Sequence, residues 1–407
     1  MRVLAIAFLF ILSQMVSWAR PDTDSLRVSL LTCTPGKEIF ELYGHTAIRI
    51  TCIPQTAGRA AQADNEDWVF NFGVFSFNQP YFVPRFVKGD TDYTMDAVPF
   101  DTFLAAYLNE GRNVVEQKLS LTQPEARRLY QALLRLIRSE GWTYRYNFFK
   151  DNCTTRARDM IEQAIDGKVL YPQSDSVLTY RSIIHAYTSQ SPWSEVGQDL
   201  LLGAEADMPL SVREQQFVPF RLKEAFANAS VETTPHTPRR QLVVAEGTYT
   251  APRPLVTKAT VIGPGAVSHV LWWLTLALLV IRWRRRDAGW LWGYDGMLLL
   301  LQGAIGVVIS YLFCFSTHPT VGSNWLIAVF NPLPLVALPF VLQRSRKRRS
   351  VAYHYVAGTV LLAFCLGKPL IPQHIPTPVL SLAWNLLLLS AGYILIHLYS
   401  MKSTSHP

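Results

Sequence analysis

The polar and apolar positions divide the chain into two unlike halves. In the first half, apolar side chains alternate with polar ones in several short segments, as they do in strands that have one buried face. We predict such strands at residues 26–32, 46–52, 68–72 and 114–119. From residue 266 onward, long apolar runs replace this alternation.

Helical signals are interspersed with the strands. Thr122 and Glu125 form a capping box in front of an apolar stripe that reaches residue 137, which predicts a helix there. Strands and helices do not alternate strictly, so an α+β domain is predicted rather than a parallel α/β sheet.

A second helix should begin at Cys153. Asn152 or Asp151 can cap its first turn, and Gly167 can end it, because short polar side chains favour the position before a helix and glycine the position after it.

The second half contains five apolar runs, each near the ~17 to 25 residues that cross a bilayer core. They are residues 266–281, 290–315, 325–342, 351–366 and 379–399, and we predict an all-α transmembrane bundle of five helices. Arginines crowd the ends of the first and third runs. By the positive-inside rule these loops are cytoplasmic, so the preceding half of the chain lies outside.

The N-terminus favours the same topology. A basic start, an apolar core and small residues before Arg20 are typical of a signal peptide, with an uncleaved anchor as the alternative. We therefore divide the chain into a signal peptide at 1–19, a periplasmic domain at 20–230, a linker at 231–265 and a membrane domain at 266–401. With this topology, we expect the protein to lie in the inner membrane.

The composition agrees with a membrane protein, since 49% of the residues are hydrophobic and only 17% are charged. The net charge of +8 is concentrated beside apolar runs, so it reports topology and requires no nucleic acid. The chain lacks paired CxxC, HExxH, G-x-S-x-G and Walker sequences, and we predict neither a metal nor a cofactor.

Cys153 has the best setting for chemistry. A thiol in the first turn of a helix faces unpaired N–H groups and the positive end of the dipole, which favour the thiolate. The same N–H groups can hold an oxyanion. Alternatively, Cys153 packs in the core or forms a disulfide with Cys33 or Cys52; a bridge between these last two would leave it free.

His45 is the candidate base. It lies at the mouth of a predicted strand, and an imidazole facing a helix-borne thiol makes a nucleophilic Cys–His pair. Asn71, which points opposite to Trp68 and Phe70, could orient the imidazole. The alternatives are a strand-end histidine that only stabilises the fold and an ordinary structural amide.

Several long motifs resemble the Bacteroidota lipoprotein N-acyltransferases called Lnb. The resemblance covers nearly the whole chain and rests on segments 31–38, 43–49, 70–75, 85–89, 146–156, 317–319, 324–325 and 331–333. It implies a permuted papain-like thiol domain, similar to NlpC/P60 and lecithin:retinol acyltransferase-like enzymes.

The resemblance also implies an activity. An acyl chain would pass from a membrane phospholipid, through a thioester, to the α-amino group of a diacylated lipoprotein. Cys153 matches the nucleophile and His45 the base, while Glu38 and Asn71 match polar motif positions. The relatives often use a second histidine where this chain offers Asn71.

Further residues are candidates for substrate contact. Asn152 and Tyr43 flank the proposed pair, and a predicted periplasmic loop between membrane helices carries His318, Asn324 and Trp325. The alternative for the loop residues is that they anchor the interface or cap a helix.

Two other functions remain open at this point. One is a membrane-anchored cell-wall peptidase of NlpC/P60 type, and the other is a non-catalytic chaperone for lipoproteins or lipids in which Cys153 is structural. Digestion of muropeptides tests the first, and alkylation of the thiol tests the second.

Overall fold

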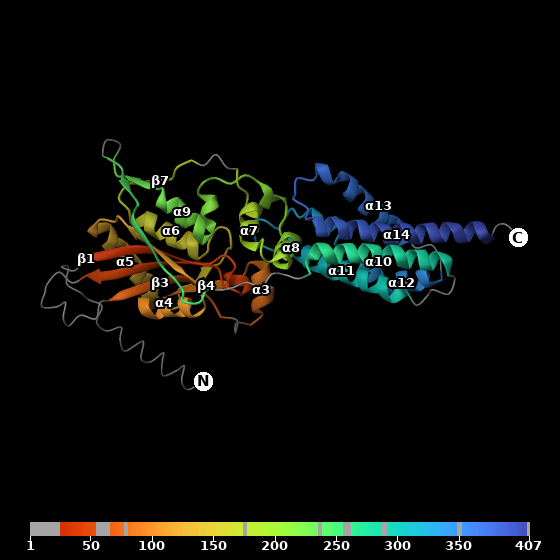
Figure 1. Ribbon diagram of the computed structural model, residues 1–407, viewed down its shortest axis with the longest axis horizontal. Coiled ribbons are helices and arrows are strands. Elements are labelled where there is room, and N and C mark those ends of the chain that lie inside the picture. The colour runs from red at the N-terminus through yellow and green to blue at the C-terminus, as the bar shows by residue number, and fades with distance from the viewer. Residues whose placement is uncertain are drawn as a thin grey trace, which may run out of the picture.

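The computed structural model describes residues 25–53, 66–76, 80–173, 177–234, 238–254, 262–285, 291–347 and 352–404. The predicted signal peptide and His236 lie outside these ranges. An N-terminal domain built on a sheet stands against one end of a long helical bundle (Figure 1).

An antiparallel sheet of seven strands organises the N-terminal domain, in the order β10-β5-β1-β2-β3-β4-β6. The strands are β1 (Ser25–Cys33), β2 (His45–Ile53), β3 (Asp67–Val74), β4 (Asp92–Pro99), β5 (Val114–Leu119), β6 (Tyr144–Arg145) and β10 (Val243–Tyr249). The four strands predicted from alternation are confirmed, with ends shifted by at most two residues.

Helices cover both faces of the sheet. The shorter ones are α3 (Phe82–Lys88), α4 (Phe100–Asn109), α7 (Tyr180–Thr188), α8 (Pro192–Leu201) and α9 (Pro219–Ala227). The main core lies between the sheet and α5 (Gln123–Arg138), α6 (Cys153–Ala164) and α9, and it includes Phe70 and Phe72. On the opposite face, Ala47 and Val69 pack against Phe100 and Phe103 of α4.

The predicted helix starts are confirmed by the caps. Thr122 and Glu125 form the capping box of α5. Asn152 caps α6 by accepting hydrogen bonds from the backbone N–H groups of Thr154 and Thr155. The helix ends at Ala164, before the expected Gly167.

The sheet extends into the range that we assigned to a linker. β8 (Ser230–Glu232), β9 (Arg240–Gln241) and β7 (Lys168–Leu170) form a small second sheet. β10 then pairs with β5 and completes the edge of the main sheet. The sequence of β10, VVAEGTY, contains a glycine and does not alternate between apolar and polar residues, so periodicity does not predict it. Its pairing with β5 makes it a strand.

The C-terminal part is helical. Its helices are α10 (Pro264–Arg284), α11 (Trp292–Phe315), α12 (Leu333–Arg346), α13 (Ala352–Gly367) and α14 (Thr377–Thr404). In the described part of the chain, four segments are long and apolar enough to cross a membrane, namely Pro264–Arg284, Trp292–Phe315, Trp325–Arg344 and Thr377–Tyr399. The fourth expected run, residues 351–366, forms α13, which has only 16 residues. Short 3-10 helices complete the chain at η2 (Ile39–Glu41), η3 (Ala204–Asp207), η4 (Glu214–Phe217), η6 (Trp325–Ala328) and η7 (Lys368–Leu370).

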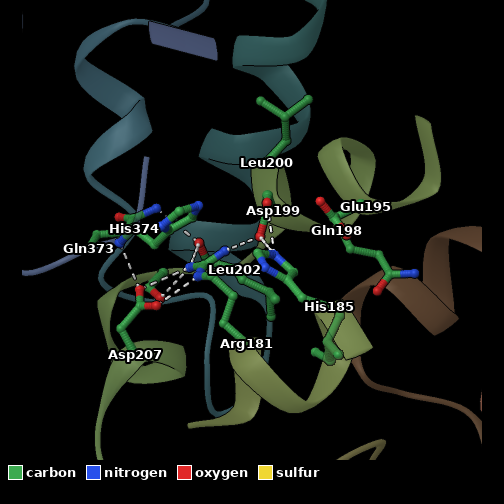
Figure 2. A network of polar contacts seen from close by, with 12 residues as sticks. Arg181, His185, Glu195, Gln198, Asp199, Leu200, Leu202, Asp207, Gln373 and His374 are labelled. Carbon is green, nitrogen blue, oxygen red and sulfur yellow. Dashed lines mark hydrogen bonds and ion pairs between the residues drawn. The ribbon is translucent and has the colours of Figure 1, made fainter. Parts of the chain in front are cut away.

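A buried polar cluster, which we call the joint, attaches the two parts to each other (Figure 2). Arg181 of α7 binds Asp199 at 2.5 Å and Asp207 at 2.8 Å. Asp207 also accepts a hydrogen bond of 2.9 Å from the backbone N–H of His374, which lies between α13 and α14. Gln373 donates to the carbonyl oxygen of Leu202 at 2.9 Å. These bonds fix the N-terminal domain on the ends of the membrane helices.

Candidate active site

The structure brings His45 and Cys153 together where β2 begins. Cys153 is the first residue of α6, which packs against β2 and β3. Gly44, with φ +81°, turns the chain into β2, where a Cβ atom would lie 2.3 Å from the carbonyl oxygen of Cys33. Only glycine fits this approach, so the turn before His45 is fixed by sterics. The two side chains are hydrogen-bonded to each other and partly exposed.

The imidazole is held from its other side. Its Nε2 atom lies 3.2 Å from Oδ1 of Asn71 on β3. Because an amide oxygen only accepts, Nε2 carries a proton, and Nδ1 is left to face the sulfur of Cys153. The structure thus places the side chain of Asn71, the candidate for the third group, beside the imidazole.

Both members of the pair have shifted pKa values. Burial alone would raise the pKa of Cys153, but the charge and hydrogen bond of His45 outweigh it, and the thiol pKa falls below 9.0. Burial would lower the pKa of His45, but the charge and hydrogen bond of Cys153 raise it above 6.5. The two shifts have one cause, since thiolate and imidazolium stabilise each other.

Asn71 is held in place by the neighbouring strand. Its register partner on β4 is Asp96. Burial raises the pKa of the Asp96 carboxyl, and the nearby Asn71 side chain opposes this shift. A carboxylate accepts, so the amide nitrogen of Asn71 faces Asp96 and its oxygen faces His45. The polar line thus runs from Cys153 through His45 and Asn71 to Asp96.

The start of α6 differs from our expectation for the oxyanion. The N–H groups of Thr154 and Thr155 already bind Oδ1 of Asn152, at 2.8 and 3.0 Å. These two N–H groups are therefore not available to bind a substrate oxyanion. The backbone N–H of Thr46 and the hydroxyl of Thr154 instead help to stabilise the sulfur of Cys153 as a thiolate.

Gly73 and Tyr144 lie beside Cys153. A Cβ atom on Gly73, which has φ +94°, would lie 3.6 Å from Cβ of Cys153 and 3.8 Å from the hydroxyl of Tyr144. That hydroxyl is buried and has no hydrogen-bond partner among the described residues. Arg156 lies over the ring, 4.3 Å from its centre.

Tyr144 was missed by sequence reasoning. It lies just before the motif that begins at Tyr146 and has no feature of its own that marks a polar site. Only the pairing of β6 with β4 brings it beside Gly73.

The other residues predicted near the thiol have internal contacts. Asn152 is buried, and its amide nitrogen donates to the carbonyl oxygens of Phe148 and Phe217 at 2.6 and 2.8 Å. The buried Tyr43 donates to Gln198 of α8. Glu38 is exposed, and its N–H binds the Glu41 carboxylate at 3.3 Å. Their contacts favour supporting roles over direct contact with substrate.

The residues predicted in the loop between membrane helices differ in their contacts. His318 lies 3.0 Å from the carbonyl oxygen of Phe86 in α3. Asn324 is buried, caps η6 and donates to the carbonyl oxygen of Leu200 at 2.8 Å. The ring of Trp325 is exposed, so it can meet lipid head groups. Asn324 thus has the alternative role that we gave for the loop residues, because it caps a helix.

The structure contradicts a disulfide between Cys33 and Cys52. All five cysteines are free. In the β1–β2 register, Cys33 pairs with His45 and Cys52 with Leu26, so the sulfurs lie at opposite ends of the strands. Seven residues of strand correspond to roughly 20 Å, well beyond the reach of a disulfide.

Comparison with known families decides what kind of protein this is. Residues 16–186 match the Lnb N-terminal periplasmic domain, and residues 256–402 match the Lnb transmembrane domain. The chain belongs to the Lnb family. Searches of curated proteins and of solved structures give no match.

Membership of the Lnb family agrees with the two-part architecture. The chain is a multi-pass membrane protein with a periplasmic domain, and its domains are those of a membrane enzyme that modifies lipoproteins. In the described residues, no group of three His, Cys, Asp or Glu side chains could hold a metal ion.

Proposed function

We propose that this Lnb-family chain is an N-acyltransferase of the inner membrane. It would move an acyl chain from a phospholipid, through a thioester on Cys153, to the α-amino group of a diacylated lipoprotein. The observation that carries the proposal is the hydrogen-bonded line of Cys153, His45 and Asn71 in a domain fixed on membrane helices.

The first half-reaction forms the thioester. The Cys153 thiolate attacks the ester carbonyl carbon of the phospholipid, and a tetrahedral oxyanion forms. When it collapses, the bond from carbon to the glycerol oxygen breaks, and the His45 imidazolium protonates the departing oxygen. Lysophospholipid leaves, and the acyl group stays on sulfur.

The tetrahedral oxyanion needs donors other than those used by the helix cap. The N–H of Cys153 is one backbone candidate, and the unpartnered Tyr144 hydroxyl beside Gly73 is a side-chain candidate. A buried donor that has no ground-state partner can reach an oxyanion without first breaking a bond, which favours the transition state. We therefore assign Tyr144 as an oxyanion donor.

The second half-reaction uses the same groups in reverse. The lipoprotein amine attacks the thioester carbonyl carbon, neutral His45 accepts a proton from the nitrogen, and the Cys153 thiolate leaves. Asn71 holds the imidazole in the tautomer that both steps require. Two successive transfers through one covalent intermediate predict ping-pong kinetics.

The membrane attachment serves the reaction by confinement. Both substrates are anchored in lipid, and a thiol domain fixed on the bilayer meets them in two dimensions rather than three. A strand-borne histidine that precedes a helix-borne cysteine in the chain supports a permuted papain-like arrangement for this domain.

The test compares two cysteines. Full-length Cys153→Ser should lose transfer to a diacylated lipoprotein peptide, measured by mass spectrometry of the peptide's N-terminus, and should form no acyl-enzyme. Cys52→Ser is the matched control. Cys52 is buried and lies at the end of β2 that is far from His45. If purified Cys153→Ser still transfers an acyl chain, the proposal is wrong.

A further inference from the structure

A continuous row of aromatic rings leads from the membrane side of the periplasmic domain toward the thiol. We call Phe86, Phe82, Phe75, Tyr93 and Tyr146 the aromatic track. Neighbouring ring centres are 6.1, 5.5, 5.0 and 4.3 Å apart in that order. The rings come from α3, from the residue after β3, from β4 and from the segment after β6.

One end of the aromatic track is fixed at the membrane helices. α3 contacts α11 and lies on the bundle side of the domain (Figure 1). The backbone N–H of Thr317, two residues beyond α11, donates to the carbonyl oxygen of Lys88 at 2.9 Å. The His318 ring meets the edge of Phe86 at 6.3 Å. Phe86 therefore stands where a periplasmic helix end leaves the bilayer.

The other end reaches the reacting sulfur. Tyr146 and Cys153 pack against the same core cluster. The ring centre of Tyr93 lies 6.4 Å from that of Tyr144, and the Tyr144 hydroxyl and Cys153 both border Gly73. Tyr93 connects Tyr146 to Phe75. The row thus joins the bilayer edge to the nucleophile without a gap between rings.

The aromatic track is partly open along its length. Phe86 is 39% exposed, and Phe75 and Tyr146 are partly exposed, whereas Phe82 and Tyr93 are buried behind them. Phe40, which is 55% exposed, meets the edge of Phe75 at 6.0 Å. Exposed aromatic rings gathered on one face of a water-soluble domain mark a binding surface for apolar groups.

We propose that the aromatic track binds the acyl chain of the donor phospholipid and guides it from the bilayer to Cys153. The occupant follows from the two ends of the row, since one contacts the end of a membrane helix and the other lies near the nucleophile that must reach the first carbon of the chain. This inference rests on the proposed function, and the experiments below separate the two.

The first experiment maps binding without turnover. Full-length Cys153→Ala is placed in nanodiscs that contain a phosphatidylethanolamine with a diazirine in its acyl chain near the ester. After illumination, adducts are expected on peptides that carry Phe75, Phe86 or Tyr146. Adducts confined to the membrane helices, or adducts on these peptides only from the lipid of a diacylated lipoprotein, would overturn the proposal.

The second experiment measures thioester formation on Cys153. Phe86→Ser should slow acylation by a dipalmitoyl phospholipid about tenfold, because the ring no longer covers part of the chain. Acylation by p-nitrophenyl acetate, which has no chain to bind, should change less than about twofold. Phe86→Trp should restore the rate with phospholipid.

Leu201→Ser is the matched control, since Leu201 is 38% exposed on α8, near the membrane but outside the row. It should leave both rates unchanged. If Phe86→Ser and Leu201→Ser slow the phospholipid reaction equally, the aromatic track does not guide the chain. If Cys153 of the unaltered protein is acylated by neither donor, the proposed function itself fails.

Discussion

The joint and the active site are both polar clusters in the periplasmic domain, but they differ in how far their hydrogen bonds are satisfied. In the joint, Arg181 and Asp199 are each 2% exposed at the side chain and bind each other, and Arg181 has further acceptors in Asp207 and Leu202. At the active site, Cys153 is partly exposed and the buried Tyr144 hydroxyl has no partner in the described residues.

This difference separates attachment from chemistry. A buried charge is tolerated when its partners use all of its hydrogen-bonding capacity, and a cluster of that kind is rigid. A buried hydrogen-bond donor without a partner lowers the stability of the fold. Beside a nucleophile, however, it can donate to the negative charge that develops in the transition state. The comparison assigns the joint to holding the domain and the Cys153 cluster to reaction.

The largest expected effect lies in the joint. Asp199→Ala should lower the free energy of unfolding by about 3–5 kcal/mol, because it leaves the buried Arg181 guanidinium short of a partner. Chemical denaturation of the full-length protein in detergent measures this change. Glu224→Ala, in an exposed pair with Arg221, is the control and should cost less than about 1 kcal/mol. Equal losses would show that the joint is not held by its buried charges.

The next effect concerns the open donor. Tyr144→Phe should slow acylation of Cys153 by about 10²–10³-fold, as expected for loss of one oxyanion donor, with the unfolding free energy unchanged or raised. Stopped-flow measurement of the acyl-enzyme gives the rate. Tyr93→Phe, on the paired strand, should have a much smaller effect, and similar losses for both would remove Tyr144 from the oxyanion site.

The way in which ionisation of the Cys153 thiol varies with pH should change when His45 is removed. Because the pKa of Cys153 is lowered, the thiolate should persist as the pH falls below 9.0 and disappear only as the pH passes the lowered value. In His45→Ala, burial dominates and the thiol pKa rises, so alkylation by iodoacetamide at pH 7 should slow at least about tenfold. An unchanged pH profile would refute the ion pair.

The smallest expected effect is at Glu38. Its exposed side chain belongs to the turn before β2, so Glu38→Gln should change kcat/KM for transfer by less than about threefold. A loss comparable to that of Tyr144→Phe would mean that Glu38 reaches the substrate during the reaction and would extend the active site into this turn.

Local signals allowed much of the architecture to be predicted. The Thr122 capping box and the Asn152 cap were predictable because a cap depends on residues within one turn. The strands 26–32 and 46–52 were predictable because apolar and polar side chains alternate within each short segment. β10 was not, since its strand character comes from pairing with β5 rather than from its own pattern.

Contacts between distant segments were harder to predict. The bridge between Cys33 and Cys52 was excluded only by the register of β1 and β2. His318 and Asn324 were candidates for substrate contact, with interface anchoring or helix capping as the alternative, and the structure shows that they bind α3 and the end of α8. Polar side chains in a loop carry no sequence mark of the partner that they will find.

The sequence by itself determined the two-part organisation, the export of the first half, the strand and helix that carry His45 and Cys153, and the membership of the motifs in one family. These follow from local periodicity, caps and charge beside apolar runs. Only the tertiary structure decided that the imidazole and the sulfur lie together, that Asn71 lies on the other side of the imidazole and that the unpartnered Tyr144 hydroxyl lies close by. Those contacts join residues up to about a hundred positions apart, and strand register and helix packing set them, not any property of the short segments themselves.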